Sequence, residues 1–117
     1  MQENITWADC GSSKFLSVDD IVPKSGKTVR IVGFEMRPID GKNGEPPKNK
    51  VCVKFTEFDK LLILNKTNAL TIKKVTGADL PVDSIGREIE IYVDPNIQFG
   101  NKLVEGIRLR EVQEIPI

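Results

Sequence analysis

The segment Lys27-Thr-Val-Arg-Ile-Val-Gly-Phe-Glu-Met36 is rich in β-branched residues and alternates apolar with polar side chains. This pattern predicts a long β-strand. The apolar residues before Gly33 share one face of the strand, and after it the apolar positions shift parity to Phe34 and Met36. A glycine at such a shift indicates a bulge or a sharp bend. The first strand is therefore expected to be long and bent.

Four further strands are expected downstream. Alternation predicts strands over 50–58, 87–93 and 102–112, and a short apolar run predicts a buried strand over 61–64. Two connections read as loops: residues 37–49, which hold three prolines and two glycines, and residues 94–101.

One helix is expected between the third and fourth strands. In residues 65–76, Ala69, Ile72 and Val75 recur at helical spacing, Asn65 or Thr67 can cap the start, and Gly77 closes the end. The polar cluster 65–68 at the start of the helix has two interpretations: helix capping, which we favour, or a phosphate site at a helix N-terminus.

The order of three strands, a helix and two strands is that of the OB-fold, a five-stranded Greek-key barrel. Closing such a barrel requires one long, bent strand that serves both halves of the sheet. We therefore expect an all-β fold with one helix: an OB-fold barrel over residues 27–117, preceded by a polar lead-in over 1–26 that packs on it. The competing topologies are an SH3-like barrel, which lacks this helix, and an open α+β sheet.

Composition excludes several classes of protein. The 117 residues suit one domain. No apolar run approaches the roughly 18 residues of a membrane span, and no secretory signal is visible, so a cytoplasmic protein without a membrane partner is expected. The chain has no histidine and only two cysteines, which excludes histidine-based catalysis and a Cys-only zinc site. No metal or other cofactor is expected.

The sequence contains no complete catalytic motif. Lys24-Ser-Gly-Lys-Thr28 ends like a phosphate-binding P-loop, but Ile21 stands where that motif needs glycine, and a strand follows where it needs a helix. The neighbouring carboxylates Glu88 and Glu90 lie on the outward side of a strand and read as solvated charge. We therefore expect a protein that is not an enzyme.

Charge points to a binding function instead. The 17 basic residues balance the 17 acidic ones, but residues 37–54 carry an excess of bases. In OB-folds the second and third strands and two loops, here 37–49 and 94–101, contact the ligand. Single-stranded nucleic acid requires cations for its phosphates and aromatic rings for its bases. The predicted nucleic-acid-binding residues are Arg37, Lys42, Lys48, Lys50, Lys54, Tyr92, Phe99, Arg108 and Arg110.

Alternatives remain open for several of these residues. Lys42 and Lys48 can equally be solubilising charges. Arg108 and Arg110 can follow a nucleic-acid backbone, or they can pair across the hairpin with Glu88 and Glu90, which we favour slightly because opposite charges stabilise neighbouring strands.

The chain also resembles a family of small phage and prophage proteins. The resemblance rests on Leu64-Asn-Lys-Thr-Asn68, Gly86-Arg-Glu-Ile-Glu-Ile-Tyr92 and Gly106-Ile-Arg-Leu-Arg110, and on the opening Phe15-Leu-Ser-Val-Asp-Asp20. Such proteins are encoded near replication and recombination genes, so the resemblance implies a role in handling DNA.

Two functional hypotheses follow. The first is a non-enzymatic OB-fold module that binds single-stranded DNA in phage or mobile-element replication or recombination, with replication or recombination proteins, or a second copy of the chain, as further partners. The second is a protein-interaction or structural module on the same fold, which the zero net charge and the few aromatic rings favour.

Overall fold

The computed structural model describes residues 14–39, 41 and 44–113. The strands among them are β1 (Lys27–Ile39), β2 (Lys48–Phe55), β3 (Leu62–Ile63), β4 (Glu88–Phe99) and β5 (Lys102–Arg110). The helices are the 3-10 turns η1 (Val18–Asp20) and η2 (Pro81–Ser84) and the α-helix α2 (Lys66–Thr76). The five strands form one antiparallel sheet in the order β3-β2-β1-β4-β5. The expected five strands and intervening helix are confirmed, whereas closure into a barrel is not, because β3 and β5 remain the two edges of an open sheet.

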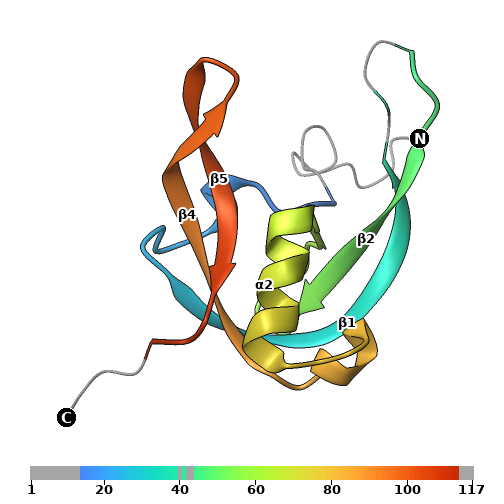
Figure 1. The fold of residues 1–117 in the computed structure, drawn as a ribbon, viewed down its shortest axis with the longest axis vertical. Helices are drawn as coiled ribbons and strands as arrows, with labels where there is room; N and C mark the ends of the chain where they lie inside the picture. The colour runs from blue at the N-terminus through green and yellow to red at the C-terminus, as the bar shows by residue number, and fades with distance from the viewer. Residues whose placement is uncertain (1–13, 40, 42–43, 114–117) are drawn as a thin grey trace, which may run out of the picture.

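The two halves of the sheet meet on β1. Its residues 27–30 pair with β4, and its residues from Ile31 to Ile39 pair with β2. The register shifts between Ile31 and Gly33, which confirms the predicted bulge. In Figure 1, β1 curves beneath the molecule, and the β1–β2 and β4–β5 hairpins rise from it as two arms. We call them the β1–β2 arm and the β4–β5 arm.

The β1–β2 arm is longer than expected. Its strands reach Ile39 and begin again at Lys48, so the prediction of a loop over all of 37–49 is wrong at both ends. Pro38 lies opposite Asn49 inside the ladder. A proline is tolerated there because β1 pairs only with β2 in this region, which makes it an edge strand.

The β4–β5 arm is also longer than expected. The predicted loop over 94–101 is wrong, because β4 continues to Phe99 and pairs with β5 up to Lys102. The register shifts between Asp94 and Ile97, and the Ile97 side chain occupies the space that a Cβ at Gly106 would need. Gly106 therefore lets the irregular stretch of β4 lie flat against β5 and continue as a strand.

The core lies on the inner faces of the curved sheet. Val29, Ile31, Val53, Phe55, Ile89 and Ile91 are fully buried there. The predicted alternation is confirmed for the inner part of β1 and for β4, where the side chains between these residues are not buried. In β2 it is confirmed only in part, because Cys52, between Val51 and Val53, is also fully buried and Val51 is exposed.

The helix α2 covers the inner side near β5. Asn65 caps it by accepting a hydrogen bond from the backbone N–H of Asn68 at 2.8 Å, and Gly77 ends it with a φ of 70°. Capping, the favoured interpretation of residues 65–68, is therefore confirmed for Asn65. The buried face contains Asn68 and Ile72 rather than Ala69, which is exposed, because the Asn68 amide reaches β5 and donates from Nδ2 to the Ile107 carbonyl at 3.1 Å.

The described part of the lead-in spans the sheet from one half to the other. At one end, the Leu16 backbone N–H donates to the Leu61 carbonyl at 2.7 Å, beside β3. At the other end, the Val93 N–H of β4 donates to the Lys24 carbonyl at 2.8 Å. Between these points Ile21 is fully buried in the core.

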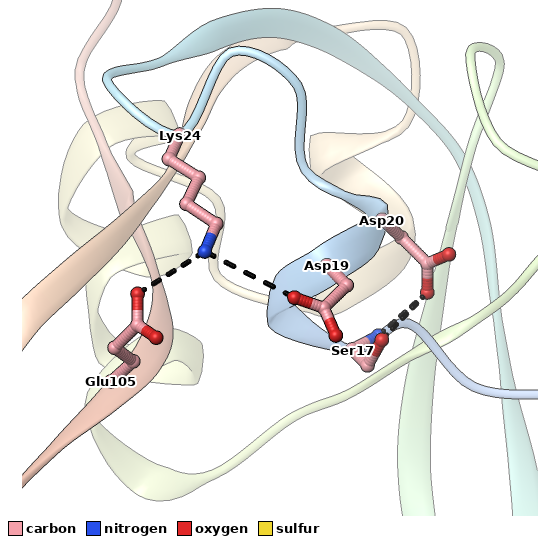
Figure 2. Close-up of polar contacts among 5 residues, drawn as sticks. All are labelled: Ser17, Asp19, Asp20, Lys24 and Glu105. Atoms are coloured by element: carbon pink, nitrogen blue, oxygen red, sulfur yellow. Dashed lines mark hydrogen bonds and ion pairs between the residues drawn. The ribbon is translucent and has the colours of Figure 1, made fainter.

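Ion pairs hold this segment in place between the arms. Figure 2 shows the Lys24 ammonium between the carboxylates of Asp19, at 4.0 Å, and of Glu105 on β5, at 3.4 Å. The Ser17 N–H and hydroxyl both donate to the Asp20 carboxylate, at 2.8 and 3.1 Å. Ser17 thus caps a single 3-10 turn, η1.

Candidate nucleic-acid interface

Three lysines follow one another along the outer face of β2. Val53 and Phe55 point into the core, so Lys48, Lys50 and Lys54 point to the opposite side of the strand. Lys48 and Lys50, as alternate residues of the strand, are roughly 7 Å apart, which is comparable with the distance between neighbouring phosphates of an extended single strand. Lys54 lies four residues beyond Lys50, with the buried Cys52 between them. Lys48 and Lys50 are exposed, and within the described residues neither forms an ion pair.

Arg37 extends this row of positive charge onto β1. It lies directly opposite Lys50 in the ladder, and its only ion pair among the described residues joins it to Glu35 at 3.0 Å. Like charges directly opposite each other destabilise neighbouring strands. An anion bound between Arg37 and Lys50 would remove that repulsion, so this position suits a phosphate.

A groove continues the positive surface at the bulge of β1. It has a volume of about 490 Å³, and Gly33 and Phe34 line it next to Arg37 and Lys54. Lys14, Glu35, Asp59, Lys60 and Leu61 complete its lining. We call this surface, together with Lys48 and Lys50, the β1–β2 groove.

Two basic residues of this groove, Lys14 and Lys60, were not predicted from the sequence. Lys14 is brought there by the lead-in, whose Lys14 carbonyl accepts from the Leu61 N–H at 3.0 Å. Lys60 forms an ion pair with Asp20 at 3.2 Å. The position of Lys60 in a tight turn directly after the second strand was a signal for it, whereas nothing local to Lys14 indicated its place.

Asp20 and the Phe58 carbonyl each hold one lysine at the edge of the groove. The Ser17 N–H, which outweighs the opposite effect of burial, and the Lys60 ammonium hold the pKa of Asp20 below its ordinary value. Lys54 is also engaged within the protein, because its Nζ donates to the Phe58 carbonyl. Lys54 and Lys60 therefore form the wall of the groove, whereas Lys48 and Lys50 are free to meet a ligand.

The outer face of the β4–β5 arm carries Tyr92, Arg108 and Arg110, as predicted from alternation. Arg110 is committed to the fold: it forms an ion pair with Glu90, and its Nη2 donates to the Ser25 carbonyl at 2.7 Å. Its guanidinium also lies 4.1 Å from the centroid of the Tyr92 ring and covers it. Cross-strand pairing, the alternative we favoured, is confirmed for Arg110, and neither Arg110 nor the covered face of Tyr92 is free for nucleic acid.

Phe99 is the exposed member of this arm, and Arg108 is half-buried and forms no ion pair within the described residues. Arg108 lies opposite Tyr92 in the ladder and does not pair with Glu88, which instead forms an ion pair with Arg30 of β1 at 3.6 Å. Phe99 is 71% exposed at the hairpin tip. Lys42, the remaining predicted site residue, lies outside the described residues.

The eight predicted residues that the structure describes do not form one surface. The outer faces of β2 and β5 belong to opposite ends of the curved sheet, because the strand order is β3-β2-β1-β4-β5. Figure 1 shows the two arms apart, although their tips rise at the same end of the molecule. The structure brings Arg37, Lys48, Lys50 and Lys54 together and leaves Tyr92, Phe99, Arg108 and Arg110 on the other arm.

Glu57 and Cys52 are engaged in the fold. Glu57 accepts from the Arg30 backbone N–H at 2.9 Å. Cys52 is fully buried, and burial, assisted by the Glu35 charge, raises the pKa of its thiol. In the part of the chain that the structure describes, no cluster of three or more His, Cys, Asp or Glu side chains is arranged to hold a metal ion.

Comparison of the chain with protein-family models, with curated proteins and with solved structures found no match. Within residues 14–39, 41 and 44–113, no helix has the length and apolar character needed to cross a membrane.

Proposed function

We propose that this protein is a non-enzymatic OB-fold module, opened between β3 and β5, that binds single-stranded DNA. The strand order β3-β2-β1-β4-β5 is the one that an OB barrel has when the contact between its third and fifth strands is missing. The helix also occurs where that fold has it, between the third and fourth strands. Partly open barrels are within the range of this fold.

The observation that carries the proposal is the row of lysines on β2. In OB-folds the face of the second and third strands contacts oligonucleotides. Here that face presents Lys48 and Lys50 without ion pairs in the described part of the chain, and Arg37 lies beside them. Phosphates bind to this row, and bases extend over the groove toward Phe34.

The arm tips supply the remaining contact in this proposal. Phe99 is the most exposed aromatic ring among the described residues and is the last residue of β4, at the tip of the β4–β5 arm. A base that stacks on such a ring gains about 1–3 kcal/mol. The resemblance to small phage proteins is the reason to propose a role in phage or mobile-element replication or recombination, with proteins of those processes as partners.

Salt-dependent binding tests the proposal. A fluorescently labelled oligonucleotide of about 30 nucleotides is titrated with protein at several salt concentrations, and the log–log slope is expected to be roughly −0.7 per phosphate contacted. The double variant Lys48→Glu/Lys50→Glu should weaken binding at least about tenfold, because it replaces two phosphate contacts with repulsion.

The matched control is Lys74→Glu/Arg87→Glu, which makes the same change of charge at two exposed residues that do not line the β1–β2 groove. If the control weakens binding as much as the groove variant does, the lysine row is not the site. If the native protein does not bind the oligonucleotide at low salt, single-stranded DNA binding is refuted and the protein-interaction module is the better hypothesis.

A further inference from the structure

A second groove lies between α2 and η2. It has a volume of about 240 Å³ and a mostly apolar lining. Leu70 and Ile72 of α2 form one wall, and Leu80 and Pro81 form the other. The remaining lining residues are Phe34, Leu64, Lys66, Ala69, Lys73, Ala78, Asp79 and Ser84. Only Phe34 of β1 is shared with the β1–β2 groove, and the other lining residues of the second groove are not among those of the first.

Large aliphatic side chains are exposed around this second groove. Leu70 is 54% exposed and Leu80 is 61% exposed, and Val82, the neighbour of Pro81 in η2, is 62% exposed. Single exposed aliphatic residues are normal on a protein surface, but a cluster around a concave apolar site indicates a binding surface. Figure 1 places η2 at the end of the molecule opposite the tip of the β4–β5 arm.

The α2 wall of the groove is positively charged, whereas Asp79 and Asp83 lie on the η2 side. The helix α2 contains Lys66, Lys73 and Lys74 and no acidic residue. Lys66 and Lys73 both line the groove, and their spacing of two helical turns places them on the same face as Leu70. Within the described residues neither lysine forms an ion pair, and Asp79 is the one acid of the lining.

The stability of the helix does not account for all of this charge. A base in the last turn of a helix interacts favourably with the helix dipole, which is sufficient reason for Lys73 and Lys74. Lys66, however, is the first residue of α2, where a positive charge interacts unfavourably with the same dipole. An acidic ligand at the rim would compensate for that unfavourable position.

We propose that this groove binds an acidic, apolar peptide segment of a partner protein. Apolar side chains of the segment enter between Leu70 and Leu80, and its carboxylates pair with Lys66 and Lys73. The complementary charge selects this class of partner over a neutral apolar one, and it disfavours a basic segment by direct repulsion.

The probe is a fluorescein-labelled peptide of about ten residues in which aspartates alternate with leucine and phenylalanine, titrated with the full chain at low salt. Saturable binding is expected, and a peptide with lysine in place of each aspartate should not bind. Both Leu70→Glu and the double variant Lys66→Glu/Lys73→Glu should weaken binding at least about tenfold. Circular dichroism checks that the variants fold, which is expected because all three residues are exposed and the dipole interaction gained by Lys66→Glu offsets the one lost by Lys73→Glu.

The control is Arg87→Glu/Lys102→Glu, which makes the same change of charge away from the groove and should leave peptide binding unchanged. Equal binding of the acidic and basic peptides, or equal losses in the control and the groove variant, would overturn the proposal. It would also be overturned if the native chain self-associated in sedimentation experiments and Leu70→Glu abolished that association, because the groove would then bind a second copy.

Discussion

Replacing Asn68 by aspartate tests how α2 is held against the open edge of the sheet. Asn68 is 2% exposed, and its Nδ2 donates to the Ile107 carbonyl of β5 at 3.1 Å. Its Oδ1 is buried without a hydrogen-bond partner in the described part of the chain. Aspartate has nearly the same shape, but when ionised it has no donor. The substitution therefore places a charged oxygen against the Ile107 carbonyl.

The cost can be estimated from competing terms. Leaving a buried partner unsatisfied costs about 1–3 kcal/mol, and a buried charge without a counter-charge costs about 3–5 kcal/mol. Asn68 is the third residue of α2, where the helix dipole returns about 0.3–1 kcal/mol to an anion. The buried-charge cost already includes the unsatisfied partner, so subtracting the dipole gain from it alone gives the expected effect: Asn68→Asp should lower the free energy of unfolding by about 2–5 kcal/mol at neutral pH.

The loss should depend on pH with a definite sign. Burial and the facing carbonyl raise the pKa of the introduced carboxyl in the folded state above its value of about 3.9 in the unfolded chain. The deficit is therefore fully present above the folded-state pKa and diminishes as pH falls through it, because the protonated acid can again donate to the Ile107 carbonyl.

Urea unfolding followed by circular dichroism, at about pH 7 and about pH 4, measures both effects. The control is Asn65→Asp, which keeps a side-chain oxygen as acceptor for the Asn68 N–H and should change stability by less than about 0.5 kcal/mol. If Asn68→Asp is as stable as the native chain at neutral pH, or if its deficit is the same at both pH values, the Asn68–Ile107 contact does not hold α2 to β5.

Three further predictions concern other parts of the fold. Asp20→Asn should lower the free energy of unfolding by about 1 kcal/mol at neutral pH. Because the Ser17 N–H holds the pKa of Asp20 below its ordinary value, the difference in stability between the native chain and the variant should shrink as pH falls through that lowered pKa, which urea unfolding measures. Gly106→Val should lower the free energy of unfolding by about 1–3 kcal/mol, because the new side chain must displace Ile97. Hydrogen exchange should show reduced amide protection in the outer half of the β4–β5 arm, and unchanged protection there would contradict this account. In a variant whose other cysteine is replaced by serine, Cys52 should react with a disulfide reagent only as fast as the protein unfolds. The reason is that Cys52 is fully buried and that burial raises the pKa of its thiol. Rapid reaction in the native state would show that the thiol is accessible.

Features set by neighbouring residues were predicted well. The bulge at Gly33, the cap at Asn65 and the helix end at Gly77 depend on backbone freedom and on side chains within a few residues, so the local sequence contains the information. The alternation of Ile89, Ile91 and neighbouring residues likewise reports which face of a strand is buried. The pairing of Arg110 with Glu90 was one of two alternatives that cross-strand register allowed.

The lengths of the two arms were predicted poorly. Prolines and glycines in 37–49 and 94–101 indicated loops, but a strand with a neighbour on one side only can accept Pro38, and Gly106 allows the irregular stretch around Ile97 to remain paired. The strand propensity of a residue is an average over many structural environments. The particular partner strand decides whether an unfavourable residue is tolerated.

Local sequence thus specified the five strands and the α-helix, their order and most of the side chains that the strands bury, whereas Cys52 is buried against the alternation. It did not specify closure of the sheet, because closure requires hydrogen bonds between β3 and β5, which are remote in sequence, and these strands remain edges with α2 packed on β5 through Asn68. The division of the candidate site residues between the two arms likewise depends on contacts between strands that are remote in sequence. Periodicity assigns Lys50 and Arg108 to outward faces, but only the curvature of the assembled sheet separates those faces onto two arms.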